Sequence, residues 1–336
     1  MTGQLTLDKA GPGLSIQDLG RDGGMGLGLS RGGAADRRAF LKGAALLGNP
    51  ADAAALEMTV GGGQFRVDAP TRIAISGATL RATIDGNALE HLASYALKPG
   101  EALRIGPPDT GVYGYLHVAG GLLSDKELGG RGRHRIAGLG PDLAPGDRLP
   151  FGDDPEPDAP PLRLSPDQPV DAPVRVIPGP QTGLFPKGIL ARFQDTVFIR
   201  SPRGNRQGVR MDHDGAPFAT EAQLGQVSDF ITEGDIQMTG DGTPFVLLAE
   251  CQTMGGYPRI GTVIPADLHR IAQARLDEEV RFRFIGFDEA EATWQTDEDL
   301  YRSFRKAREP RIRDPREMAD LLSYELIDRP DPGVAG

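Results

Sequence analysis

The chain is poor in cysteine, tryptophan and histidine, and the scarcity of cysteine and histidine limits which disulfides and metal sites it can form. The single cysteine cannot form an internal disulfide, and no pair of histidines or cysteines has the spacing of a zinc site. No hydrophobic run approaches the roughly 18 residues that a membrane-spanning helix needs. The start lacks a basic segment followed by an apolar one, which is the pattern of a secretory signal. We therefore expect a soluble, cytoplasmic protein without a metal.

Clustered basic charge is also missing. The 336 residues include 37 lysines and arginines against 47 acidic residues, which gives a formal net charge of −10. No dense basic block occurs before the C-terminal tail, whereas contacts to a phosphate backbone need clustered positive charge. We expect a small molecule as the ligand, and neither nucleic acid nor a membrane as a partner.

Glycine and proline are abundant instead, with 46 and 28 residues, while 39% of the chain is hydrophobic. Short apolar runs separated by turn-forming residues are typical of β proteins. Turn signals of this kind occur at Asp85-Gly86, Pro99-Gly100 and Asp241-Gly242. Helices are predicted over residues 34–47 and 264–274. The expected fold class is mainly β, with few short helices.

Composition divides the chain into four predicted segments. Residues 1–150 and 174–290 form two β-rich subdomains, and residues 151–173, dense in proline and acid with almost nothing to bury, form an extended linker. Residues 291–336 form a charged helical tail. Its charge favours a solvated appendage over a partner-binding arm.

A polar loop follows the apolar run 245–249 and the only cysteine, Cys251. It contains Gln252, Thr253, two glycines and Tyr257, and the end of a strand is a rigid place from which to aim such groups. Without a strong acid or base, this loop would position a neutral amide-type or ureido substrate and stabilise an oxyanion. The alternative is a tight turn whose polar groups satisfy only the backbone.

Two possible nucleophiles have weaker support. Ser30 lies in a G-x-S-x-G pattern followed by a predicted helix, but the preceding stretch is too rich in glycine for the buried strand that a nucleophile elbow needs. No histidine has a recognisable catalytic context. Cys251, at the end of an apolar strand, is better explained as an inert, partly buried thiol. A serine hydrolase acting through Ser30 stays open as an alternative.

Several short motifs follow one another in a fixed order between residues 13 and 287, and together they are specific. They include S-I-Q-D-L-G-R at 15–21, G-A-x-D at 33–36, V-A-G-G at 118–121, V-I-P-G-P-Q at 176–181, R-x-G-x-R at 206–210 and Q-T-x-G-G-Y-P at 252–258. In these motifs the chain resembles the biotin-dependent carboxyltransferase family, which includes the C subunit of 5-oxoprolinase, allophanate hydrolase subunit 2 and the matching subdomains A and B of urea amidolyase.

The resemblance implies a cyclophilin-like β-barrel and a place in a complex. A complementary carboxyltransferase chain, similar to the B subunit of 5-oxoprolinase, would carry the other half of the active site, and a lactam-hydrolase subunit would join it in a 5-oxoprolinase. ATP, carboxybiotin or both would act through these partner subunits. The substrate would be an amide, a lactam or a urea-type molecule, which agrees with the chemistry inferred for the polar loop.

The loop and the resemblance together predict the site residues. The predicted catalytic residues are Gln252, Thr253 and Tyr257. The predicted substrate-binding residues are Gly255, Gly256, Gln237, Asp18, Arg21, Asp36 and Arg206. Among the latter, Asp18, Arg21 and Asp36 would order the facing loop or bind an anionic end of the substrate.

Some motif positions depart from the family pattern. Glycine replaces a hydroxyl residue at Gly32, Gly130, Gly132 and Gly204, asparagine replaces an aspartate at Asn205, and the S-E-G motif is matched to residues 228–230. Each lost group removes a hydrogen bond of about 0.5–3 kcal/mol. These departures leave a second hypothesis, a catalytically degenerate subunit that binds or regulates a partner.

Overall fold

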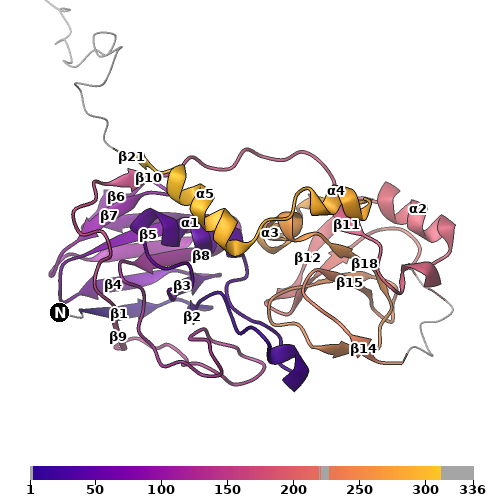
Figure 1. The fold of residues 1–336 in the computed structure, drawn as a ribbon, viewed down its shortest axis with the longest axis horizontal. Helices are drawn as coiled ribbons and strands as arrows, with labels where there is room; N and C mark the ends of the chain where they lie inside the picture. Colours follow the sequence, from indigo (N-terminus) through magenta and orange to yellow (C-terminus); the bar gives the residue numbers. More distant parts are fainter. Residues whose placement is uncertain (1–2, 219, 221–226, 312–336) are drawn as a thin grey trace, which may run out of the picture.

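Two β bodies lie side by side in the computed structural model, which describes residues 3–218, 220 and 227–311 (Figure 1). The first body contains a nine-stranded sheet and the second an eight-stranded sheet that curls into a nearly closed barrel. The expected mainly β fold is therefore confirmed. In the described part of the chain, no helix has the length and apolar character to cross a membrane.

The first sheet has the order β2-β3-β8-β4-β1-β9, and β5 pairs with β6, β7 and β8. Its strands are β1 Gln4–Ala10, β2 Ser15–Gln17, β3 Ala55–Met58, β4 Gly63–Val67, β5 Thr71–Ile84, β6 Asn87–Ala88, β7 Ser94–Leu97, β8 Leu103–Val118 and β9 Arg148–Pro150. The predicted turn at Asp85-Gly86 joins β5 to β6, with φ of 48° and 88°. Both values suit the tight hairpin turn that this residue pair favours.

The second sheet has the order β19-β12-β13-β16-β15-β18-β11-β20, antiparallel except for the β11–β20 pair. Its strands are β11 Val174–Ile177, β12 Phe198–Asn205, β13 Gly208–Asp212, β15 Asp235–Met238, β16 Pro244–Leu247, β18 Arg259–Val263, β19 Glu279–Val280 and β20 Phe282–Phe284. Two small sheets pair β10 Leu162–Arg163 with β21 Glu309–Pro310, and β14 Asp229–Phe230 with β17 Met254–Gly255. Asp241-Gly242 forms the predicted tip between β15 and β16.

The described residues include five α-helices and two 3-10 turns. They are α1 Arg37–Leu47, α2 Lys187–Asp195, α3 Pro265–Gln273, α4 Phe287–Glu291 and α5 Asp297–Lys306, with 3-10 turns η1 Gly24–Leu27 and η2 Thr182–Leu184. Helix α1 begins later than the predicted 34–47. The reason is that the side chain of Asp36 caps the helix by accepting a hydrogen bond from the amide of Ala39, at 2.9 Å.

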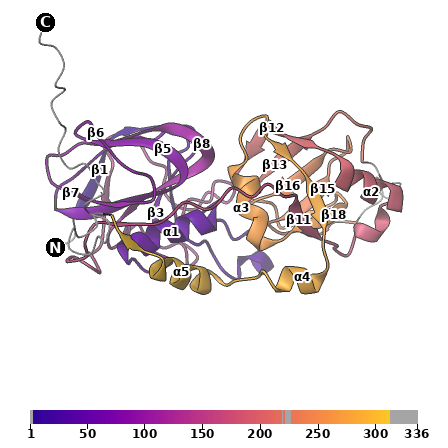
Figure 2. The ribbon, with the colours of Figure 1, turned by 90° about the horizontal axis from the view of Figure 1, so that it is seen from above.

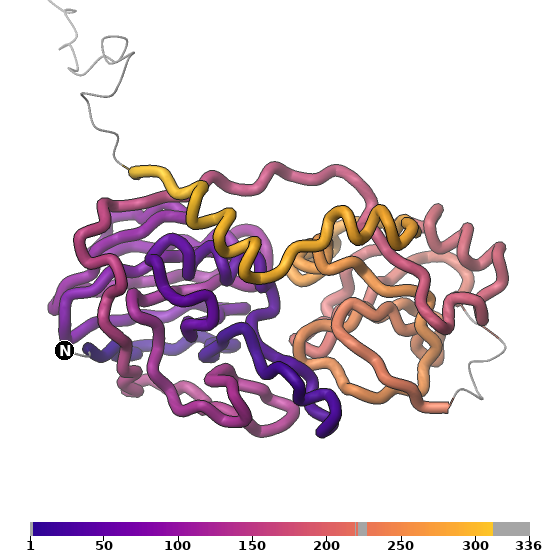
Figure 3. The backbone as a smooth tube through the Cα atoms, viewed as in Figure 1, coloured from indigo at the N-terminus to yellow at the C-terminus, as the bar shows by residue number. Residues whose placement is uncertain are grey.

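The chain crosses between the bodies twice (Figure 3). Residues 151–173 lead to the second body, and the segment after α4 returns to the first, where α5 lies alongside α1 (Figure 2). The predicted linker and the described part of the predicted tail are mostly exposed, but each contributes at least one buried side chain. Leu162, Leu164 and Phe304 are each at most 8% exposed and pack in one cluster with α1. Residues 312–336 of the predicted tail lie outside the described residues.

One buried arginine joins the two bodies. Arg206, in the turn between β12 and β13, forms ion pairs with Glu57 of the first body and with Glu250 of the second, the latter at 2.6 Å. It also donates to the carbonyl of Gly33. Burial alone would lower the pKa of Arg206, but the charges of Glu57 and Glu250 raise the pKa above its ordinary value. The arginine therefore stays charged at the centre of the junction.

We predict that Arg206→Ala lowers the free energy of unfolding by about 3–5 kcal/mol, because it leaves two buried carboxylates without a counter-ion. Arg210→Ala is the matched control, since Arg210 is close in sequence and pairs with the more exposed Asp212 and Asp241. That change should cost roughly 0–1 kcal/mol. Urea unfolding measures both values, and equal losses in the two variants would contradict the central role of Arg206.

Candidate functional site

Two cavities lie where the bodies meet, with volumes of about 630 and 780 Å³. A turn after β16 runs between them, closed by a hydrogen bond from the amide of Cys251 to the carbonyl of Leu248, at 2.9 Å. Within this turn, Ala249 and Cys251 line the smaller cavity and Glu250 lines the larger one. We call the smaller one the Glu233 cavity and the larger one the Arg200 cavity, after a charged residue that lines each.

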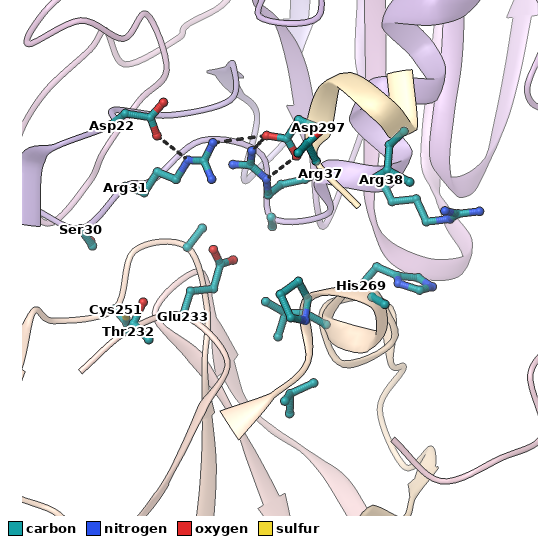
Figure 4. Close-up of a pocket in the computed structure, with 18 of the residues that line it drawn as sticks. Asp22, Ser30, Arg31, Arg37, Arg38, Thr232, Glu233, Cys251, His269 and Asp297 are labelled. Atoms are coloured by element: carbon teal, nitrogen blue, oxygen red, sulfur yellow. Dashed lines mark hydrogen bonds and ion pairs between the residues drawn. The ribbon is translucent and has the colours of Figure 1, made fainter. Parts of the chain in front are cut away.

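Charged groups face each other across the Glu233 cavity (Figure 4). Arg31 and Arg37 of the first body both pair with Asp297 at the start of α5, and Arg31 does so at 3.3 Å. Glu233 comes from the second body, and Figure 4 shows its carboxyl group pointing toward the two arginines. Among the described residues, no side chain or amide forms a hydrogen bond with this carboxyl group.

The environment makes Glu233 a suitable proton carrier. Burial raises its pKa, and the charges of Arg37 and Arg31 oppose this shift without cancelling it. Burial, followed by the nearby charge of Arg31, lowers the pKa of Arg37 to about 10. A carboxyl group with a raised pKa in a cavity can act as a general acid or base, and two guanidinium groups can stabilise a developing negative oxygen.

Ser30 also lines the Glu233 cavity, and its hydroxyl lies 3.0 Å from Nε2 of the buried His134. No motif in the sequence signals this pair. The amide of Ala137 donates to Nδ1 of His134 at 3.2 Å, and burial lowers the pKa of the ring. The neutral ring therefore has its proton on Nε2 and donates to Ser30. It cannot accept the serine proton in this arrangement, which weighs against Ser30 as a nucleophile.

Cys251 is inert, as expected. The thiol is 5% exposed, and burial raises its pKa to about 12. A thiol with this pKa is not ionised at neutral pH and is a poor nucleophile. Within the described residues, no group of three or more histidine, cysteine, aspartate or glutamate side chains is placed to hold a metal ion.

The predicted polar loop lies outside both cavities. Gln252 and Tyr257 are exposed, Thr253 is buried, and Gly255 belongs to β17. The loop is held by the pairing of β17 with β14. Gln237 lies under it, because a Cβ on Gly255 would come within 2.5 Å of Nε2 of Gln237. That nitrogen is buried and has no hydrogen-bond partner among the described residues.

Three predicted residues order loops beside the junction. Asp18 accepts hydrogen bonds from the amides of Gly20 and Arg131, at 2.8 and 2.6 Å. Arg21, which also lines the Glu233 cavity, donates to three loop carbonyls, those of Glu127, Gly130 and Gly132. Asp36 caps α1 and accepts a hydrogen bond from Gln273 of the second body, at 2.9 Å. Of the two roles considered for them, these contacts favour loop ordering over substrate binding.

The glycines that replace family hydroxyls have close neighbours. A Cβ on Gly130 would lie 2.8 Å from Cγ of Arg21, and one on Gly32 would lie 2.9 Å from the ring of His134. A Cβ on Gly132 would lie 2.8 Å from Gln17, and one on Gly204 would lie 3.0 Å from Arg200. Polar side chains therefore fill the space that a side chain at each of these glycines would need.

Glu233 and Arg200 were not among the predicted site residues. The sequence does carry a signal for Glu233, because Thr232-Glu233-Gly234 fits the S-E-G motif more closely than residues 228–230 do. This match restores both the hydroxyl and the acid of that motif. Arg200 has no comparable signal, since its importance depends on which residues surround it in space.

Comparison with known proteins identifies the family of this chain. Residues 27–284 match the model of a family described as carboxyltransferase domain, subdomain A and B. The chain is 31% identical to the C subunit of 5-oxoprolinase from Escherichia coli K12, covering 85% of this chain and 93% of the relative. It is 30% identical to the protein of that name from Haemophilus influenzae, over 82% and 89%. A putative urea carboxylase of Emericella nidulans is 28% identical, but the match covers only 23% of that protein.

Solved structures share the fold of this chain. The crystal structure of TTHA0988 superposes with a TM-score of 0.74 at 29% identity, over 84% of this chain and 56% of the other, so this chain spans just over half of that protein. The urea amidolyase of K. lactis shares the fold, with a TM-score of 0.80 at 22% identity over 93% of this chain and 21% of that one. The chain therefore belongs to the family of carboxyltransferase domains built from subdomains A and B.

Proposed function

We propose that this chain is the counterpart of the C subunit in a 5-oxoprolinase-type complex that opens a lactam or related amide. The observation that carries the proposal is the extent of the matches, because the two 5-oxoprolinase relatives match over 93% and 89% of their length. The urea carboxylase and urea amidolyase relatives match over only 23% and 16% of theirs. The match therefore takes in nearly the whole of each 5-oxoprolinase subunit but only a part of each urea carboxylase or urea amidolyase.

In this proposal the substrate binds in the Glu233 cavity. Opening a lactam with water forms a bond from the water oxygen to the carbonyl carbon and breaks the bond between that carbon and the nitrogen. The water loses a proton, and the nitrogen leaves with the electron pair and needs a proton. Glu233, with its raised pKa and no hydrogen bond to a described residue, supplies that proton. Arg31 and Arg37 stabilise the negative charge on the carbonyl oxygen. A complementary B-like chain and a lactam-hydrolase subunit complete the site, and ATP acts through them.

The polar loop is proposed to contact the substrate or the partner once the complex forms. Gln252 and Tyr257 are exposed next to Phe230 and Met254, which are 61% and 44% exposed. An apolar surface of this kind, beside polar groups, is suited to being covered by another chain. The roles proposed for Thr253, Gly255 and Gly256 depend on that covering. If biotin takes part, carboxybiotin would reach the loop from the partner side.

Reconstitution tests the function. The full chain, mixed with a complementary B-like chain and a lactam-hydrolase subunit, should hydrolyse ATP in step with the opening of 5-oxoproline. Omitting this chain should abolish the coupled reaction. Urea with carboxybiotin is the comparison substrate, and turnover of that pair alone would contradict the 5-oxoprolinase-type proposal. A complex that forms but turns over neither would favour the degenerate, regulatory alternative.

We predict that Glu233→Gln lowers kcat of the reconstituted complex by roughly 10²- to 10⁴-fold, the usual contribution of a general acid. The amide has nearly the same shape, so KM and assembly should change little. Glu298→Gln is the matched control, because Glu298 lies on α5 next to the cavity-lining Asp297 but does not line the cavity. Equal activity of the two variants would exclude Glu233 from the chemistry.

The pH dependence gives an independent check. A general acid must be protonated, so kcat should fall as pH rises through the pKa of Glu233, which burial places above the ordinary glutamate value. Glu233→Gln should remove this limb of the profile, whereas Glu298→Gln should keep it. A limb that persists in Glu233→Gln, or a rate that rises with pH over the same range, would contradict the proposed proton donor.

A further inference from the structure

The Arg200 cavity is larger than the Glu233 cavity and has a different lining. The first body contributes Val60, Tyr113 and Ile136, and the second contributes Arg200, Glu250 and Leu276. The proposed reaction does not use this cavity. Arg200, Glu250 and Tyr113 supply polar groups to its wall, while Val60, Ile136 and Leu276 are 68%, 59% and 56% exposed and give it an apolar rim.

Arg200 is a buried cation without a counter-ion. It is 8% exposed, and it forms no ion pair with a carboxylate among the described residues. Nη1 donates to the carbonyl of Ser201 at 3.0 Å, whereas Nε is buried and has no hydrogen-bond partner in the described part of the chain. The buried Arg206, six residues later, differs in this respect, because ion pairs with two glutamates balance its charge. Burying a charge without such a partner is costly, so the unsatisfied edge of Arg200 is suited to an anion.

Other groups around the cavity favour the same kind of ligand. Arg135 and Arg275 also line it, and among the described residues their guanidinium groups form no ion pair with a carboxylate, although the protein has a net charge of −10. The hydroxyl of Tyr113 forms no hydrogen bond with a described residue. Burial, followed by the charge of Glu57, raises the pKa of Tyr113 to about 12, so this hydroxyl keeps its proton and can donate it to a hydrogen bond.

We propose that the Arg200 cavity binds an organic carboxylate. The Nε and Nη2 edge of a guanidinium group matches the two oxygens of a carboxylate, and Tyr113 donates a further hydrogen bond. The apolar body of the ligand rests against Val60, Ile136 and Leu276. Glu250 on the same wall repels a second negative charge, so a carboxylate fits better than a phosphate dianion.

Gly204 makes room for this ligand. It lies on the cavity wall, and a Cβ there would come within 3.0 Å of Nη2 of Arg200. Its φ is not in the left-handed region, so alanine is compatible with the backbone. Gly204→Ala therefore crowds the binding edge of Arg200 while keeping its charge.

Calorimetric titration of the full chain tests the proposal with three probes: benzoate, benzamide and inorganic phosphate. Benzoate should bind, while benzamide, which has the same shape without the charge, and phosphate should bind at least about tenfold more weakly. Arg200→Gln and Gly204→Ala should each weaken benzoate binding at least about tenfold. Arg203→Gln is the matched control, since Arg203 is on the same strand, β12, but does not line the cavity.

Thermal unfolding separates a ligand-binding role from a structural one. Arg200→Gln removes an unbalanced buried charge, so its Tm without ligand should be no lower than that of the wild type. Benzoate should raise the Tm of the wild type and of Arg203→Gln, but not that of Arg200→Gln. No binding of benzoate at millimolar concentrations, equal binding of benzamide, or full binding by Gly204→Ala would overturn the proposal.

Discussion

The ion-pair cluster of Arg206 with Glu57 and Glu250 is the interaction on which the arrangement of this protein depends. One guanidinium group contacts a strand of the first sheet, the turn after β16 in the second body and the carbonyl of Gly33. Removing three charged groups from water costs free energy that their attraction only partly returns. The benefit is geometric, since the cluster fixes how the two bodies face each other. Gln273 adds to this by accepting from the amides of Val112 and Tyr113 in the first body.

The ion-pair cluster of Arg206 lies between two side chains that lack such partners among the described residues. Glu233 lies in one cavity without a hydrogen bond to a described residue, and Arg200 lies in the other without a carboxylate partner among those residues. A polar side chain without a partner costs free energy in a folded protein. Two such side chains in cavities therefore indicate candidate ligand sites. The turn at residues 249–251 forms part of the wall of both cavities. A ligand in either one would therefore contact a segment that the junction holds in place.

Local features could be predicted from the sequence, and long-range packing could not. The turns at Asp85-Gly86 and Asp241-Gly242 and the helix at 265–273 depend on neighbouring residues, so their patterns were sufficient. The partners of Leu162 and Phe304 are distant in the sequence, and a charged, proline-rich context concealed their burial. The same limit applies to the site. Motifs identified Arg206, but only the folded junction shows that Glu233 and Arg200 lack partners among the described residues, and that loop 252–257 lies beyond both cavities.

We expect the junction to make the two bodies one cooperative unit. Hydrogen exchange measured along a urea titration tests this directly, because it reports the opening of the two sheets separately. In the wild type, amides of β5 and β8 should lose protection at the same urea concentration as amides of β15 and β16. In Arg206→Ala, the two sets should separate. Two distinct midpoints in the wild type, or coincident midpoints in the variant, would contradict the account.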